Sequence, residues 1–189
     1  TPMALSEAQK SFFANPYSDF WPFIESHDFE RESIFLEMER QYEEEGIFSI
    51  GPWFGRFLNF LVRFGGANRV LEFGTASGYS AAWIAKGLPP DGMLVTIEKD
   101  PHCLRMAREN IQKAELEKKV DIREGEAESI IPDMAPSFDF IFVDCAHPTA
   151  LKCAERLLRP GGLFVCDNVG FTNKFVTMWG SPTKMNSTL

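Results

Sequence analysis

The chain has 189 residues, of which 44% are hydrophobic, and its 19 basic and 27 acidic residues give a net charge of −8. The negative charge disfavours a nucleic-acid or anionic-membrane surface. No apolar stretch is long enough to span a bilayer, and the four cysteines form no C-x-x-C pair, which favours reduced thiols. The composition therefore predicts a cytoplasmic protein.

This length favours one domain with a substantial core, over residues 1–189. We expect three consecutive parts, an N-terminal helical segment, an α/β core and a short tail, over residues 1–66, 67–169 and 170–189. In the first part, Asp28 can cap a helix that ends at Gly46. A second helix follows Pro52 and closes at Gly65-Gly66.

From Arg69 onward, short apolar runs alternate with helical patterns. The expected strands are Arg69–Phe73, Met93–Ile97, Val120–Arg123, Phe138–Val143 and Leu163–Cys166. The expected helices are Ser77–Lys86, Pro101–Ala114, Glu126–Ile131 and Thr149–Leu158, with a turn at Pro160-Gly161-Gly162. This alternation predicts an α/β fold, a Rossmann-like, doubly wound and mostly parallel sheet with N-terminal helices. Ligands bind such sheets beyond the carboxyl ends of the strands.

The first of these strands runs directly into a glycine loop. Gly74 and Gly78 do not have the G-x-G-x-x-G spacing of a dinucleotide site, and Glu72 would repel a pyrophosphate. A nicotinamide-dependent oxidoreductase is therefore the weakest interpretation. A carboxylate suits a cationic ligand, and S-adenosylmethionine carries a sulfonium and an ammonium. The residues assigned to this donor site are Glu72, Gly74, Thr75, Ser77, Gly78, Tyr79 and Ser80.

The other strand ends also carry polar groups. Glu98 directly follows the second strand, where it can accept both ribose hydroxyls of an adenosine. After the third strand, Gly125, Glu126 and Ala127 can meet the adenine. Asp144 follows the fourth strand, where it can contact the donor's amino group or a metal ion. This agreement among strand ends is more specific than any one motif.

Asp144 forms a second group with Asp167 and Asn168, which follow the fifth strand. Neighbouring strands lie about 4.8 Å apart, so carboxylates that end two of them can share a cation. Two carboxylates and an amide oxygen suit Mg²⁺, Mn²⁺ or Ca²⁺ better than zinc. Such an ion would lower the pKa of a bound hydroxyl. The simpler interpretation of Asp167-Asn168 is a turn.

Residues from about Ile50 to Val169 resemble the cation-dependent O-methyltransferases, a group that includes catechol and caffeoyl-CoA O-methyltransferases. The resemblance is carried by Leu71–Ser80, Val95–Glu98, Gly125–Glu128, Phe138–Asp144, Leu157–Gly162 and Asp167-Asn168. It implies a class I methyltransferase fold, with Gly74, Tyr79 and Ser80 beside the methionine part of the donor and Glu98 at the ribose. It also implies that Phe48 and Ile50 cover the donor, and that Asp144, Asp167 and Asn168 hold the metal.

The sequence departs from this family at three points. The family usually carries a lysine base three residues after the first metal aspartate, and here that position is His147, whose imidazole can act as a base near neutral pH. A solvated loop histidine is the simpler interpretation. The segment between Asp144 and Asp167 is shorter than usual and lacks the expected tyrosine. The sequence ends at Leu189, so the family's usual C-terminal helix and strand pair, which shape the acceptor pocket, are missing from it.

The leading functional hypothesis is methyl transfer to a hydroxyl of a small, aromatic diol. A donor-binding protein with reduced or no turnover is the second hypothesis, motivated by His147 and the short C-terminal part. A modified tRNA base is a further candidate acceptor, disfavoured by the acidic balance. The family and the aromatic N-terminal helices suggest a homodimer.

Overall fold

The computed structural model describes residues 29–47, 49–144, 152 and 156–167. Contacts divide the chain into Thr1–Ser33 and Ile34–Leu189, and the strands described below all belong to the second unit. The division into residues 1–66, 67–169 and 170–189 stays a prediction.

Among the described residues, two helices precede the sheet, as the sequence predicts. Helix α3 (Ser33–Glu45) ends at Gly46, whose φ of 65° suits glycine. Helix α4 (Gly51–Phe64) ends at Gly65. A Cβ added at Gly55 would lie 2.3 Å from the Trp83 ring, so this glycine lets α4 approach helix α5 (Tyr79–Gly87) closely. Asp28, the expected cap of the first helix, lies outside the described residues.

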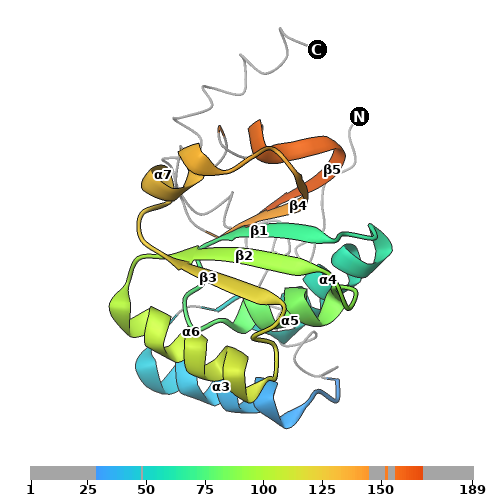
Figure 1. The fold of residues 1–189 in the computed structure, drawn as a ribbon. Coiled ribbons are helices and arrows are strands. Elements are labelled where there is room, and N and C mark those ends of the chain that lie inside the picture. Colours follow the sequence, from blue (N-terminus) through green and yellow to red (C-terminus); the bar gives the residue numbers. More distant parts are fainter. Residues whose placement is uncertain (1–28, 48, 145–151, 153–155, 168–189) are drawn as a thin grey trace, which may run out of the picture. The chain divides into compact units, whose positions relative to one another are not determined.

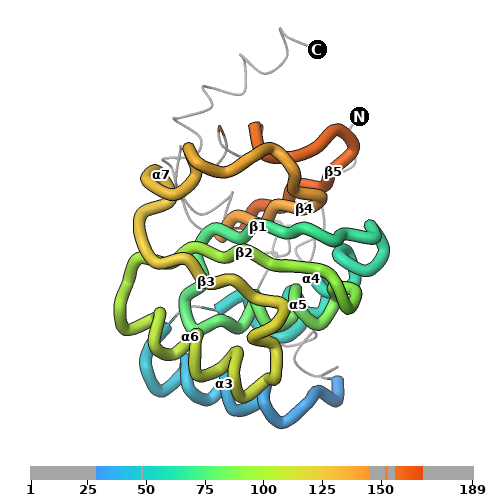
Figure 2. Tube along the Cα trace, in the orientation of Figure 1, coloured from blue at the N-terminus to red at the C-terminus, as the bar shows by residue number. Residues whose placement is uncertain are grey.

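Five strands form one sheet in the order β3-β2-β1-β4-β5 (Figures 1 and 2). They are β1 (Arg69–Phe73), β2 (Met93–Glu98), β3 (Val120–Glu124), β4 (Phe138–Val143) and β5 (Leu158–Cys166). All four pairings are parallel. The predicted doubly wound parallel sheet is therefore confirmed. Its strand order reverses between β1 and β4, the point where such sheets bind ligands.

The helices between the strands agree with the prediction to within two residues at most ends. Helix α5 begins at Tyr79 instead of Ser77, because Gly78 has a left-handed φ of 86° that cannot continue a helix. Helix α6 (Pro101–Lys113) begins after Asp100, whose side chain accepts hydrogen bonds from two backbone amides. The predicted helix over Glu126–Ile131 divides into α7 (Ala127–Ile130) and the short helix η1 (Ile131–Asp133).

The last strand differs from the prediction. Strand β5 begins at Leu158, so Pro160-Gly161-Gly162, predicted as a turn, lies within it. Leu158 pairs with Phe138 and Leu163 with Phe140, and an irregularity between these pairs accommodates the extra residues. The predicted helix over Thr149–Leu158 consequently stops before Leu158, and most of it lies outside the described residues.

Alternate residues of the strands face two different layers. One face packs against α7 and η1 and forms a buried cluster of Leu71, Phe73, Val95, Ile97, Ile131, Met134, Phe138, Ile141, Val143 and Leu157. The other face meets α4, where the Phe54 and Phe142 rings lie 6.0 Å apart. Figure 1 shows α4, α5 and α6 on this second side and α7 on the first. Because side chains alternate along a strand, Glu72 and Thr96 belong to the α4–α5 side.

Helix α3 packs outside α5 and α6. The Phe35 ring stacks on Trp83 at 4.1 Å and meets Tyr79 edge-on at 5.7 Å. Lys113 of α6 forms an ion pair with Glu37 of α3. Helix α3 thereby contacts the two helices that follow β1 and β2.

Candidate active site

The carboxyl ends of the strands form one row of polar residues. Each parallel ladder continues by one hydrogen bond beyond its strand: Gly74 N donates to Ile97 O (3.1 Å), Gly125 N to Glu98 O (2.8 Å), Asp144 N to Phe73 O (3.0 Å) and Asp167 N to Val143 O (2.9 Å). With the strand order, these bonds arrange the row as Gly125, Glu98, Gly74, Asp144 and Asp167. The row crosses the point where the strand order reverses. The sheet therefore brings together residues from five separate parts of the sequence.

The glycine loop between β1 and α5 is a tight, left-handed turn. Gly74 and Gly78 have φ values of 94° and 86°, and Ala76, which has a side chain, has a φ of 45°. Gly78 N donates to Thr75 O at 2.8 Å, which closes the turn. A positive φ at a residue with a Cβ costs about 1 kcal/mol or more, so contacts from outside the loop must hold this shape.

Glu98 supplies one of those contacts. Its Oε2 accepts a hydrogen bond from Ala76 N at 2.9 Å, while its Oε1 accepts from Lys99 N (2.8 Å) and Asp100 N (2.9 Å). The carboxylate is thus fixed beside the glycine loop by three backbone amides. Each carboxylate oxygen can accept more than one hydrogen bond, so the group retains capacity for a ligand hydroxyl.

Glu72 lies in a chain of hydroxyl groups behind the loop. Its side chain is fully buried, and its Oε2 accepts from Thr96 Oγ1 at 2.6 Å, which in turn lies 2.6 Å from Thr75 Oγ1. Burial raises the pKa of Glu72 to about 8; the hydroxyls of Ser80 and Thr96 lower it, while Asp144 and Glu98 raise it. Its Oε1 has no hydrogen bond of normal geometry within the described part of the chain. A buried carboxyl with an unused acceptor favours a nearby positive charge.

Thr96 was not predicted as a site residue. A polar residue between Val95 and Ile97, in an otherwise apolar strand, was the available indication. Asn110 of α6 was missed as well. Its side chain is buried, and its Nδ2 donates to Ser77 O at 2.9 Å.

The predicted residues at the start of α5 have different environments. Ser77, in the loop, and Ser80, in the first turn of α5, are both buried. The Tyr79 ring is also buried, but its hydroxyl donates to Glu39 Oε1 of α3 at 2.5 Å. Burial and this bond raise the pKa of Tyr79. The Tyr79 side chain is therefore directed toward α3, and its backbone is the part that belongs to the loop.

The third strand end is more open. Gly125 has a φ of 138°, a conformation that suits glycine, and Ala127 begins α7. Glu126 is exposed and pairs with Lys99 at 3.2 Å. Ile50, predicted to cover the donor, is half-buried directly before α4.

The candidate metal site is described only in part. Asp144 and Asp167 follow the adjacent strands β4 and β5, in the register set by the Val143–Cys166 pair. Among the residues that the structure describes, no three His, Cys, Asp or Glu side chains gather as a metal site. Two carboxylates that end neighbouring strands fit a hard divalent cation. The third predicted ligand, Asn168, lies outside the described residues, as do Phe48 and His147.

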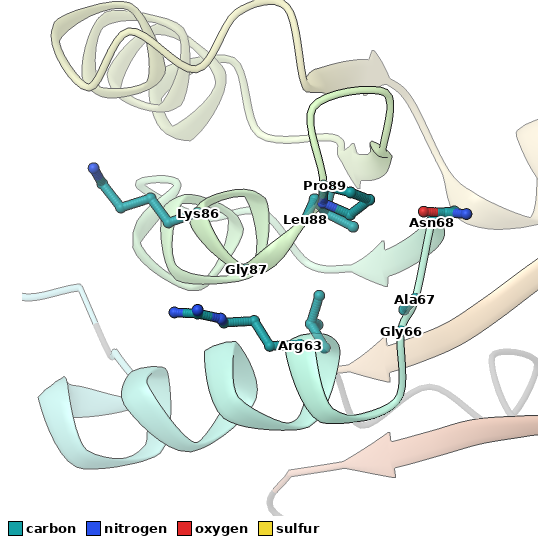
Figure 3. A pocket seen from close by; sticks show the side chains of 9 residues that line it. Arg63, Gly66, Ala67, Asn68, Lys86, Gly87, Leu88 and Pro89 are labelled. Atoms are coloured by element: carbon teal, nitrogen blue, oxygen red, sulfur yellow. The ribbon is translucent and has the colours of Figure 1, made fainter.

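A separate pocket of about 530 Å³ opens at the amino ends of the strands. It lies between the last turns of α4 and α5, and its lining residues are Val62, Arg63, Gly66, Ala67, Asn68, Lys86, Gly87, Leu88 and Pro89. Figure 3 shows Arg63 and Lys86 at one end of this pocket and Asn68 at the other. None of the predicted site residues lines it.

In the described ranges, no helix has the length and apolar character needed to cross a membrane.

A parallel sheet of order β3-β2-β1-β4-β5, with a glycine loop after β1 and an acidic residue ending β2, is the Rossmann-like fold of the class I methyltransferases. A family model described as O-methyltransferase matches residues 30–186. The chain belongs to this O-methyltransferase family.

Two curated relatives are similar over the middle of the chain. A catechol O-methyltransferase of Niastella koreensis is 42% identical over 128 residues, which cover 64% of this chain and 58% of the relative. A caffeoyl-CoA O-methyltransferase of Zea mays is 34% identical over 139 residues, covering 69% of this chain and 53% of the relative. The chain thus spans little more than half the length of these two relatives.

Solved structures show the same fold. An O-methyltransferase from Bacillus cereus in complex with SAH matches with a TM-score of 0.76 and 29% identity, over 86% of this chain and 82% of that one. The O-methyltransferase TomG from Streptomyces achromogenes, in complex with SAM, matches with a TM-score of 0.75 and 28% identity, over 86% and 81%.

Proposed function

We propose that this protein binds S-adenosylmethionine at the carboxyl edge of the sheet and transfers its methyl group to a hydroxyl of a small molecule. The observation that carries the proposal is the row Gly125, Glu98, Gly74, Asp144 and Asp167, which the strand order assembles at one edge. Family membership and the SAH- and SAM-bound structural neighbours support the same donor.

The residues of the donor site fit the charges of this molecule. Glu98, held by three backbone amides, would accept the ribose hydroxyls. The glycine loop allows close approach of a ligand to the backbone, and the first amides of α5 would meet the donor's carboxylate. Glu72, buried with an unused acceptor, would favour the ammonium and sulfonium groups. Gly125, Glu126 and Ala127 would border the adenine.

We assign the chemistry of the acceptor to residues at the ends of β4 and β5. A divalent cation, Mg²⁺ for preference, would be held by Asp144, Asp167 and Asn168, and it would lower the pKa of an acceptor hydroxyl. His147 would take the proton from that hydroxyl. The sulfonium donor is already reactive, so the protein acts mainly by orienting donor and acceptor and by excluding water.

The acceptor class is proposed from the relatives. Proteins named for catechol and caffeoyl-CoA are among them, which supports an aromatic acceptor with adjacent oxygens. We also propose that the protein forms a homodimer and acts in the cytoplasm. The exposed Phe57, Phe60 and Phe64 on one side of α4 support the dimer.

Titration calorimetry tests the donor site. S-adenosylmethionine added to the protein should bind in the micromolar range. The proposal is rejected if S-adenosylmethionine gives no measurable heat and S-adenosylhomocysteine does not compete with it for the protein. Methyl transfer from labelled donor to catechol should then depend on Mg²⁺ and cease in EDTA, and full activity in EDTA would reject the metal assignment.

Variants separate the enzyme from the second candidate, a donor-binding protein without turnover, which the histidine at position 147 favours. Asp144→Ala should abolish methyl transfer, and Asp133→Ala, at an exposed acidic residue of η1, is the matched control. If donor binds but no transfer to any catechol-like acceptor occurs with Mg²⁺, the binding protein is the better description.

A further inference from the structure

The side chain of Asn110 connects the glycine loop to helix α3. It is 1% exposed on α6, and its Nδ2 lies 2.9 Å from Ser77 O and 2.7 Å from Gln41 Oε1. Both partners are acceptors, so the atom facing them must be the amide nitrogen, and both of its hydrogens are used. A buried amide with two such partners has a single favourable orientation.

The same face of α6 also supports the loop through packing. Ala107 lies one turn before Asn110, and a Cβ added at Gly78 would approach Ala107 Cα to 3.3 Å. Two neighbouring loop residues are thereby fixed by α6, Ser77 through its carbonyl and Gly78 through close contact.

Helix α3 contacts this arrangement from outside the α/β core. Gln41 accepts from Asn110, and Glu39, two residues earlier, accepts from the Tyr79 hydroxyl at 2.5 Å. Tyr79 follows Gly78 directly. Two polar side chains of α3 are therefore connected to the loop, Gln41 through Asn110 and Glu39 through Tyr79.

We infer that Asn110 and Gln41 are positioning residues for donor binding, and that α3 is energetically coupled to the glycine loop through them. The inference rests on the proposed donor site. The loop contains left-handed residues, including Ala76, whose conformation is stable only while surrounding contacts hold it. Loss of the Gln41 acceptor leaves the Asn110 amide with an unpaired buried hydrogen, so the loop samples other shapes and donor affinity falls. By linkage, donor binding stabilises α3 to the same extent.

Two changes at position 41 test this coupling. Gln41→Met removes the acceptor, and Gln41→Glu keeps an acceptor oxygen at the same distance along the side chain. Gln112→Met makes the same chemical change at an exposed position of α6. We expect Gln41→Met to raise the Kd of S-adenosylhomocysteine about tenfold, with the other two variants within about twofold of the unsubstituted protein. The Kd of adenosine, which lacks the methionine part, should change little in all three.

The same readout separates positioning from a purely structural role. Affinities are measured well below the melting temperature, where every variant is folded, so a lower Tm alone does not change Kd. If Gln41→Met lowers the Tm but leaves the Kd of S-adenosylhomocysteine unchanged, the inference is overturned. Asn110→Ala should give a larger increase in Kd, but Gln41 carries the test if that variant does not fold.

Amide hydrogen exchange distinguishes failure of this inference from failure of the proposed function. If the unsubstituted protein binds no donor, the proposed function is wrong, and the coupling is then determined on the unliganded protein. The amides of Ala76 and Gly78 should exchange faster in Gln41→Met than in Gln41→Glu. Equal rates in the two variants would overturn the coupling whatever the ligand.

Discussion

Acidic side chains have opposite environments at the two edges of the sheet, where the strands have their amino ends and their carboxyl ends. At the amino edge, Asp139 accepts from Asn68 N (2.7 Å) and Arg69 N (2.8 Å) and pairs with Arg159, so it ties β1, β4 and β5 together. Burial opposes ionisation there, but these donors hold the pKa of Asp139 below its usual value. At the carboxyl edge, burial raises the pKa of Glu72 to about 8. The carboxylate at the first edge is well solvated by the protein, and the one at the second is not.

This difference separates stability from ligand binding. Polar groups that are fully hydrogen-bonded to one another, as at Asp139, stabilise the fold and leave few donors or acceptors for a ligand. A buried carboxyl with an unused oxygen, as at Glu72, destabilises the unliganded protein and is compensated when a cation binds. The expected effects of substitution therefore differ in kind between the edges.

The largest expected effect is the pH dependence caused by Glu72. Its pKa is raised on folding from 4.5 to about 8. The folded state therefore binds the proton more tightly, and the contribution to stability is full below about pH 4.5 and is lost as pH rises to about 8. We expect the free energy of unfolding to fall by on the order of 3 kcal/mol between pH 5 and 8 from this group.

Glu72→Gln isolates that contribution, because glutamine has the same shape and does not titrate. Urea unfolding at several pH values should show a flatter profile for Glu72→Gln than for the unsubstituted protein. Parallel profiles would mean that Glu72 ionises normally in the fold, and the contrast between the two edges would then be lost.

Glu98→Ala should have the next largest effect, on donor affinity. Removal of a carboxylate that accepts ribose hydroxyls and also holds Ala76 N should weaken binding of S-adenosylmethionine about 100-fold. Calorimetry measures this, with Glu109→Ala, an exposed glutamate of α6, as the control. An unchanged Kd would remove Glu98 from the donor site.

Asp139→Ala should act on stability alone. Loss of its bonds to two backbone amides and to Arg159 should lower the free energy of unfolding by about 2 kcal/mol at pH 7. Because the pKa of Asp139 is lowered on folding, this stabilisation is present above the unfolded-state pKa and is lost as pH falls through the folded-state pKa. The free energies of unfolding of Asp139→Ala and of the unsubstituted protein should therefore converge in acid.

Asp121→Ala is the matched control for that prediction. Asp121 pairs with Arg123 at 3.0 Å on the surface of β3, and both side chains are more than two-fifths exposed. An exposed pair contributes about 0.5 kcal/mol, so this variant should unfold almost as the unsubstituted protein does. Equal destabilisation by the two substitutions would show that Asp139 acts no differently from a surface ion pair.

The fold was predictable because its indications are local. The apolar run before Gly74 and the one at Phe138–Val143 set β1 and β4 to the residue. Strand β5 was placed too late, since Pro160-Gly161-Gly162 is typical of a turn and only pairing with β4 brings it into a strand. Glu98 could be placed beside the glycine loop because strand ends share an edge. The contacts of Asn110 with Ser77 and Gln41 could not be predicted from the sequence, because they depend on how α3, α5 and α6 pack together.

Arg63→Met should have the smallest effect on stability, and it tests whether the amino edge of the sheet influences ligand binding at the carboxyl edge. Arg63 lies in the last turn of α4 and lines the pocket at the amino edge, far along the strands from Glu98. A cation there interacts favourably with the helix dipole, so its removal should destabilise the protein by about 0.5 kcal/mol. Donor affinity should not change, because no residue of the glycine loop lines that pocket. A weaker affinity for S-adenosylmethionine in Arg63→Met would mean that the two edges are not independent, and that ligand binding at one reaches the polar groups of the other.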